Sequence, residues 1–149
     1  MRKIKLVPIG ALVAAVLTAA AVAAAGTHMK AMSLSATLNA GQEVPHPKGV
    51  RAGASGKFTA TVTGTKVTWK LTFSHLTGPA TAAHIHAGKK GEAGGVIVPL
   101  CGPCTSPASG TATVTSAVVK QMEAGTTYVN VHTVKNAGGE IRGQVKASM

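Results

Sequence analysis

The sequence predicts an all-β domain, an antiparallel Greek-key sandwich or flattened barrel of about seven to eight strands with one short helix. From residue 33 onward, apolar and polar residues alternate in short segments that are rich in β-branched side chains. This alternation is the pattern of half-buried strands. Glycine and proline separate the segments at the spacing expected of all-β proteins. A leader of different character, predicted to be a signal peptide, precedes the domain.

The leader, residues 1–25, has the three parts of a secretory signal peptide. Its basic start consists of Arg2, Lys3 and Lys5. An apolar run begins at Leu6, and Ala23 and Ala25 satisfy the small-x-small pattern for cleavage after Ala25. An uncleaved membrane anchor is the alternative, because the run is long enough to span a bilayer. Cleavage would give a secreted or periplasmic protein that does not span a membrane, with a tail at 26–32 and the domain at 33–149.

Eight segments of the domain carry the strand pattern. They are 33–40, 57–64, 66–74, 82–87, 95–100, 110–116, 126–133 and 139–147. A short hairpin turn around Gly64 joins the second and third segments, and Trp69 is the natural large core side chain. The single helix is predicted at 116–125, with Ser116 as its cap and Gly125 at its end.

The alternation places three histidines on the side of the sheet away from the core. His84 and His86 share one face of their segment, and Ile85 takes the other face. In 126–133 the two valines share one face, while His132 lies on the opposite face. If the apolar residues point to the core, all three histidines point away from it.

The predicted hairpin between the last two segments brings a charged residue to the same face. A three-residue loop, 136–138, with Gly138 at positive φ, would place His132 directly opposite Arg142. Their Cβ atoms would then be about 5 Å apart. The alternation independently places Glu140 and Arg142 on the histidine face, away from the core.

These three histidines form a candidate metal site. An H-x-H pair on a strand holds its Cα atoms roughly 6.5–7 Å apart, so both rings can reach one ion. Three neutral imidazoles suit copper(II) or zinc(II). H-x-H by itself is weak evidence, because histidines on exposed strands are common. The placement of His132 on the same predicted face as His84 and His86 strengthens the prediction.

Charge and composition argue against several other functions. The formal net charge is +11, but the basic residues are scattered and the aromatic residues are few, unlike in a nucleic-acid-binding protein. The chain has four glutamates and no aspartate, so it offers neither a Ser-His-Asp triad nor paired carboxylates. The charge fits solubility and a mild attraction to anionic polymers or membranes.

The stretch CGPC copies the thioredoxin motif, but TSPASG follows it and cannot begin a helix of any length. In an exported protein, Cys101 and Cys104 are expected to form a local disulfide. A redox-active pair and a pair of thiolate metal ligands are the alternatives.

Several blocks resemble the CHRD family, named for its occurrence in chordin and found in secreted bacterial proteins. They are ATLNAGQEVP, VTWKLTFSHLTGPATAAHIHAG and TYVNVHT with GGEIRGQ. The resemblance covers nearly all of 33–147. The resemblance implies an extracytoplasmic domain. The bacterial members of the family are mostly of unknown function.

The pattern is also similar, more loosely, to the copper site of Cu/Zn superoxide dismutase. That family carries an H-x-H strand, a later histidine ligand and an arginine near its C-terminus on a Greek-key barrel; the matching residues are His84, His86, His132 and Arg142. Its zinc site needs further histidines and an aspartate after the H-x-H, and 87–95 contains neither. The resemblance thus implies a copper-type site and, if the protein is an enzyme, a copper-dependent dismutase-like oxidoreductase.

Three other residues have open roles. Glu43 lies in the GQEVP block and is either a partner that orients a histidine N–H or a loop glutamate paired with a lysine. Glu140 joins Arg142 as a residue that orients a ligand or binds an anion. If cleavage follows Ala25, His28 becomes the third residue and the N-terminus can chelate copper(II).

Two functions remain in view. The first is an exported protein that binds a transition metal, with copper as the first choice and zinc as the second, for metal handling or redox protection. The second is a metal-free module whose histidine face binds a cell-envelope or matrix protein.

Overall fold

The computed structural model describes residues 30–148. The predicted signal peptide and His28 therefore lie outside the described residues. Nine antiparallel strands form one sheet in this part of the chain. They are β1 (Met32–Asn39), β2 (Ser55–Thr63), β3 (Lys66–Ser74), β4 (Ala80–Ala87), β5 (Val96–Cys101), β6 (Ala108–Thr113), β7 (Thr127–Thr133), β8 (Ile141–Gln144) and β9 (Lys146–Ser148).

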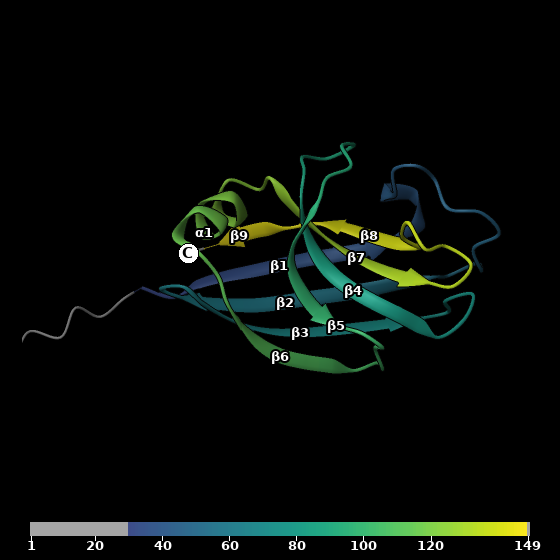
Figure 1. Ribbon diagram of the computed structural model, residues 1–149, viewed down its shortest axis with the longest axis horizontal. Helices are drawn as coiled ribbons and strands as arrows, with labels where there is room; N and C mark the ends of the chain where they lie inside the picture. The colour runs from purple at the N-terminus through teal and green to yellow at the C-terminus, as the bar shows by residue number, and fades with distance from the viewer. Residues whose placement is uncertain (1–29, 149) are drawn as a thin grey trace, which may run out of the picture.

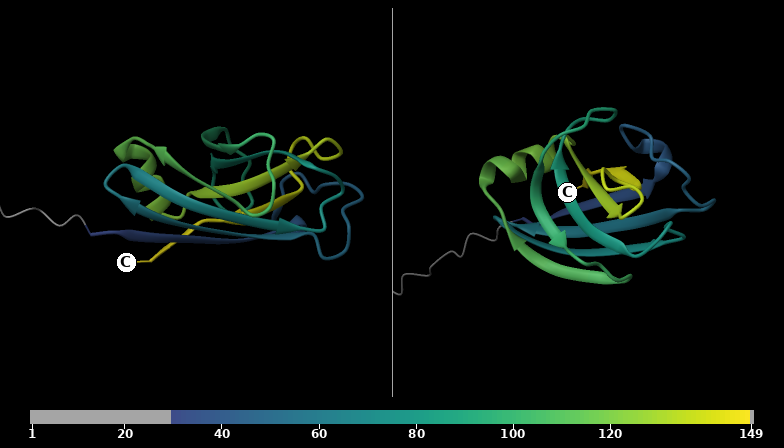
Figure 2. Two further views of the ribbon diagram at one scale, coloured as in Figure 1. Left: turned by 90° about the horizontal axis from the view of Figure 1, so that it is seen from below. Right: turned by 45° about the vertical axis from the view of Figure 1, so that its right-hand side comes forward.

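The sheet curls into a nearly closed barrel, which confirms the predicted fold class. Its strand order is β5-β4-β7-β8-β1-β2-β3-β6, and β9 pairs with β1 beyond the end of β8. β5 and β6, the two ends of this order, lie next to each other and bring the barrel close to closure (Figures 1 and 2). Because β3 pairs with β6 while β4 pairs with β7, the chain crosses the barrel ends in the Greek-key manner.

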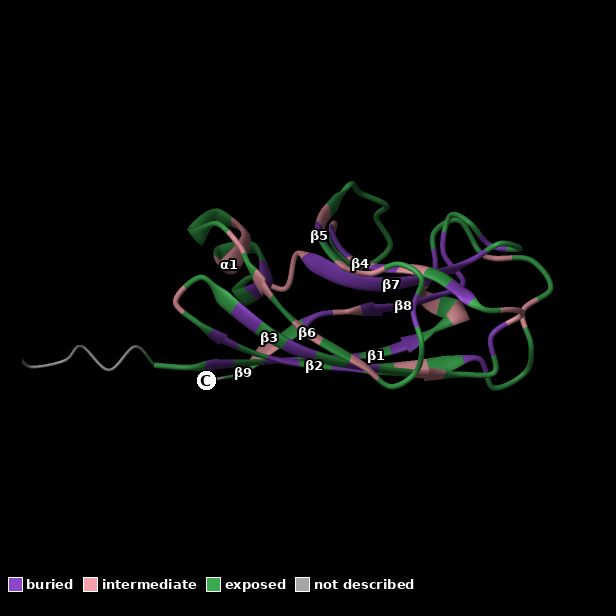
Figure 3. Ribbon diagram, turned by 60° about the horizontal axis from the view of Figure 1, so that its bottom comes forward, coloured by how far each residue is buried: buried purple, intermediate pink, exposed green. Residues whose placement is uncertain are grey.

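Alternation of side chains builds the core, as predicted from the sequence. Along β1 to β3, buried and exposed residues follow one another, visible as alternating bands in Figure 3. The inward residues include Phe58, Trp69, Leu71, Ile85 and Val129, all at most 4% exposed. The predicted turn at Gly64, with φ of 61°, links β2 to β3.

The helix α1 (Ser116–Glu123) forms where expected, but its cap is Thr115 rather than Ser116. The Thr115 hydroxyl accepts a hydrogen bond from the backbone N–H of Val118. Gly125, with φ of 68°, follows the helix as predicted. Met122 is fully buried and ties α1 to the core.

The predicted register between the last two strands is wrong by two residues. Arg142 lies opposite Asn130 rather than His132, and the glycine at positive φ is Gly139 rather than Gly138. The connection is wider than a three-residue loop because Thr133 and Glu140 organise it with their side chains. A shift of two keeps every residue on its face, so His132 and Arg142 still share one. Val145 also interrupts the predicted strand 139–147, dividing it into β8 and β9.

Candidate metal centre

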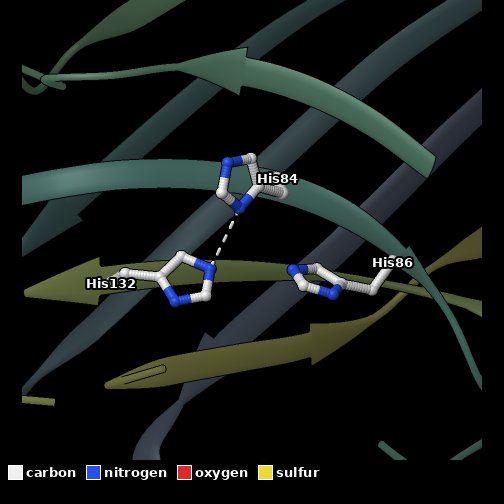
Figure 4. Close-up of side chains that lie close together, drawn as sticks. All are labelled: His84, His86 and His132. Carbon is white, nitrogen blue, oxygen red and sulfur yellow. Dashed lines mark hydrogen bonds between the residues drawn. The ribbon is translucent and has the colours of Figure 1, made fainter. Parts of the chain in front are cut away.

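Neighbouring strands β4 and β7 bring the three predicted histidines together. One ring nitrogen of each of His84, His86 and His132 lies within 4.8 Å of the others. The ring centroids are 5.0 to 5.7 Å apart. Figure 4 shows a nitrogen of each ring turned to the space between the three side chains. The H-x-H spacing supplies two rings from one face of β4, and His132 comes from the adjacent face of β7.

Two of the histidines are oriented by backbone carbonyls. The His86 Nδ1–H donates to Gly94 O at 3.0 Å, and the His132 Nδ1–H donates to Ala137 O at 3.0 Å. Each bond fixes the neutral tautomer that leaves Nε2 without a proton. The His86 Nε2 is buried and has no hydrogen-bond partner, so this ring presents an unused lone pair to the cluster. Orientation of one ring nitrogen by a carbonyl is the usual support of a metal-binding histidine.

The third histidine, His84, is joined to His132 by a hydrogen bond between ring nitrogens. His84 Nδ1 lies 3.2 Å from His132 Nε2. Because the proton of His132 is on Nδ1, its Nε2 accepts, and the His84 Nδ1–H donates. A metal ion at this point would replace that proton. The donor set would then be Nδ1 of His84 with Nε2 of His86 and His132.

The cluster fits a copper or zinc ion. Three nitrogens that bind one ion at about 2.0–2.1 Å in a trigonal or tetrahedral arrangement lie about 3.3–3.6 Å apart. A separation of up to 4.8 Å must therefore shorten by about 1.2–1.5 Å, through rotations of the rings about their side-chain bonds. Burial is the main cause that lowers the pKa of all three histidines below the usual value, and mutual repulsion lowers those of His84 and His132 further. At neutral pH the rings are uncharged, which is the form that binds a metal.

A stack of side chains supports His86 from behind. The Tyr128 ring lies against His86, with 4.9 Å between centroids and 11° between planes. The Tyr128 hydroxyl accepts from Gly94 N at 3.1 Å and lies 3.2 Å from Gly94 O, the atom that orients His86. Arg142, from β8 on the other side of β7, places its guanidinium carbon 3.4 Å from the Tyr128 centroid. Tyr128 lies four residues before His132 in β7, so period-two alternation places both side chains on one face.

Arg142 is on the predicted face but is not solvated. It is only 1% exposed, and its Nη2 donates to Lys89 O at 2.9 Å. The face away from the core, where the alternation places Arg142, is therefore covered at this position rather than exposed to solvent. Tyr128 separates the guanidinium from His86, since the two stack on the ring from β8 and β4 respectively.

Glu43 lies close enough to Arg142 for the guanidinium charge to act on its carboxyl group. The carboxylate accepts a hydrogen bond from Asn130 Nδ2 at 3.3 Å, and the side chain is 2% exposed. Burial raises the pKa of Glu43 to about 7, although the charge of Arg142 acts against this. Glu43 Oε1, Asn130 Oδ1 and Arg142 Nη1 are buried without protein partners.

Glu140 holds the loop that orients His132. Its carboxylate accepts hydrogen bonds from Thr77 N, Thr77 Oγ1 and Thr133 Oγ1 at 2.5 to 2.6 Å, and from Asn136 Nδ2 at 3.4 Å. Burial alone would raise the pKa of Glu140, but the hydrogen bonds outweigh it and lower the pKa. Ala137, which accepts from His132, is in the same loop.

Loops cover the polar face of the sheet, which sequence periodicity did not predict. Every residue of β7 is buried, as its uniform colour in Figure 3 shows. The loop 88–95 supplies Gly94, the loop 134–140 supplies Ala137, and the segment after β1 supplies Glu43. His86 and His132 are each 8% exposed and His84 is partly exposed, so the loops enclose two of the three rings. The two carbonyl acceptors left no signal in the sequence, because every residue has a carbonyl.

The cysteines form the expected disulfide, Cys101–Cys104. It lies at the end of β5, and the residues that follow lead into β6 rather than into a helix. The alternatives of a thioredoxin-like pair and of thiolate ligands are thus not supported.

Within residues 30–148, no helix has the length and hydrophobicity needed to cross a membrane.

The comparisons with known proteins agree with the family resemblance seen in the sequence blocks. Comparison with curated proteins and comparison with solved structures each return no match. The model of the CHRD domain matches residues 34–145, from β1 to just past the end of β8. With three quarters of its length matched, the chain belongs to the CHRD domain family.

Proposed function

We propose that this CHRD-domain protein is exported and binds one transition-metal ion, copper first, through His84, His86 and His132. The observation that carries the proposal is the convergence of three uncharged imidazoles, of which His86 and His132 are buried and are fixed by carbonyls so that Nε2 carries no proton. The buried Nε2 of His86 has no hydrogen-bond partner, which costs free energy, and a bound metal ion would satisfy it. Export is supported by the leader sequence and by the cysteine pair.

Copper is preferred over zinc for the first test. Copper(II) binds nitrogen ligands more tightly than the other divalent ions of its row, and three imidazoles are a donor set that it accepts well. The protein would supply the three ligands, fix their tautomers and enclose the ion in positively charged surroundings. Metal handling requires only that the site binds the ion, whereas redox protection also requires the bound ion to react.

The test is titration of the protein with copper(II) and, separately, zinc(II) at neutral pH. To exclude the N-terminal chelate, the chain should begin after His28. One tight site is expected, and the affinity should fall at least about tenfold in His84→Ala, His86→Ala and His132→Ala. His75→Ala is the matched control, because His75 is exposed and outside the cluster. Weak binding that is unchanged in the triple alanine variant would reject the metal site.

The pH dependence provides a second measurement. Protons compete with the metal for the same nitrogens, so affinity should fall as the pH drops below about 6. Superoxide consumption by the copper-loaded protein, compared with the metal-free protein and His132→Ala, then separates redox protection from metal handling.

A further inference from the structure

We infer that the outer face of β1, β2, β3 and β6 is a binding surface for an acidic polysaccharide. This face lies across the barrel from β4 and β7, so it is separate from the histidine cluster (Figure 2). Three features carry the inference: ordered rows of hydroxyl groups, positive charge of a single sign, and hollows that run along the strands.

Hydroxyl side chains form rows that cross the strands. Strand pairing places Ser33, Thr61, Thr68 and Thr111 side by side in one row. The next row contains Ser35, Thr59, Lys70 and Ser109 in the same way. All eight side chains are exposed. Neighbours in a row are about 4.8 Å apart, and each hydroxyl both donates and accepts, so the face offers a dense array of partners for sugar hydroxyls.

The charge of this face has one sign. Lys57, Lys66 and Lys70 point outward from β2 and β3, and Lys146 lies beside Ser35 on β9. None of the four glutamates of the chain lies on any of these strands. A surface adapted for solubility alone mixes both signs. A field of uniform positive sign instead attracts a polyanion.

The face is also hollowed. A depression of about 490 Å³ lies over the two rows and is bordered by Ser33, Thr59, Thr68 and Lys70. A second depression, about 350 Å³, continues along β1 to β3 and is bordered by Thr37, Lys57 and Thr72. Because both depressions lie along the same strands, they suit an extended chain better than a single small molecule.

Two other polyanions fit this face less well. Insertion into a lipid surface needs apolar anchors, but the large exposed hydrophobic residues in the described chain, Val44, Val96 and Val134, lie outside this face. Binding of single-stranded nucleic acid relies on exposed rings that stack with bases, whereas Trp69 is buried beneath the strands. An acidic polysaccharide needs only hydroxyl partners and cations, which are the groups present.

The test is binding of the purified protein to polygalacturonate at low ionic strength, with neutral dextran as the comparison polymer. The variant K57Q/K66Q/K70Q should lose about tenfold or more in affinity, since it removes three surface charges that face the polymer. The control K48Q/K120Q/K135Q removes the same charge from exposed lysines elsewhere and should change affinity less than about threefold. Equal losses in the two variants would overturn the proposal, because net charge alone would then explain binding.

A neutral variant tests the hydroxyl rows. T59V/T61V/T68V keeps the charge and the β-branched shape, and should weaken binding about threefold or more. The control T81V/T105V, at exposed positions outside the face, should leave binding unchanged. Thermal unfolding and copper binding should be retained in K57Q/K66Q/K70Q and T59V/T61V/T68V, since the face lies across the barrel from the histidines. No effect of the valine variant, or binding as tight to single-stranded DNA or to phosphatidylserine vesicles, would overturn the assignment to a polysaccharide.

Discussion

The imidazole of His86 lies almost parallel to the ring of Tyr128, with 4.9 Å between the centroids. Arg142 approaches the same tyrosine from the neighbouring strand at 3.4 Å. One aromatic ring thus connects a candidate metal ligand to a buried cation. The tyrosine hydroxyl adds a second connection, because it contacts the Gly94 peptide that orients His86. Replacement of residues in this stack should affect the metal site without touching a ligand.

Removal of the tyrosine hydroxyl should weaken metal binding. Tyr128→Phe keeps the ring stacked on His86 but loses both contacts with Gly94, so the loop 88–95 is held less firmly. We expect copper affinity to fall about three- to tenfold, with faster amide exchange in this loop. Titration and hydrogen exchange measure the two effects. Tyr128→Leu, which also removes the ring, should bind less tightly still; equal affinity in the wild type and both variants would contradict the role of the stack.

Loss of the buried guanidinium should destabilise the fold. Arg142→Gln removes the bond to Lys89 O, the contact with Tyr128 and the positive charge near Glu43. We expect the free energy of unfolding to fall by about 2–4 kcal/mol in denaturant titration. Lys146→Gln, which removes one positive charge from an exposed side chain, should lower the free energy of unfolding by less than about 0.5 kcal/mol. A loss as small as this control would show that Arg142 does not stabilise the barrel.

Glu43 should make stability depend on pH. Its pKa rises from 4.5 to about 7 on folding, so between these values the folded protein binds more protons than the unfolded chain. Stability is therefore lost as pH rises through this window, by on the order of 3 kcal/mol in full. Glu43→Gln should become more stable than the wild type across the same window and keep a constant advantage above it.

The histidines give the opposite trend, because their lowered pKa values reduce stability as pH falls below about 6.5. Taking the difference between Glu43→Gln and wild type at each pH removes that contribution. A difference that does not change with pH would contradict the raised pKa of Glu43.

Glu140 should be needed in its charged form. Three short hydrogen bonds from Thr77 and Thr133 require acceptors on both carboxylate oxygens. Glu140→Gln replaces one of these oxygens with an NH₂ group, which is a donor and cannot accept a hydrogen bond from the threonines. Glu140→Gln should lower stability by about 2–3 kcal/mol and loosen the loop 134–140. Denaturant titration measures the first effect, and Glu123→Gln, at the exposed end of α1, is the control. In wild type, the stabilisation by Glu140 should be present above its ordinary pKa of 4.5 and lost as pH falls further.

The sequence by itself determined the strands, their two faces and which three histidines lie on the same face. Period-two alternation depends only on the geometry of an extended chain, so Ile85 and Val129 had to point inward once His84 and His132 pointed outward. Although the predicted β7–β8 register was wrong by two residues, a shift of two leaves each side chain on its predicted face. Cys101 and Cys104 were close enough in sequence for their pairing to be predicted from chemistry alone.

The tertiary structure decided which nitrogen of each ring is free, how deeply the site is buried, and what surrounds Arg142. Gly94 O and Ala137 O orient His86 and His132, and a carbonyl acceptor has no signature in a sequence. Periodicity assigns a residue to a face but cannot say whether that face meets water, because loops from distant segments cover it. The His84–His132 contact joins positions 48 residues apart, and only the pairing of β4 with β7 brings their lone pairs to one point.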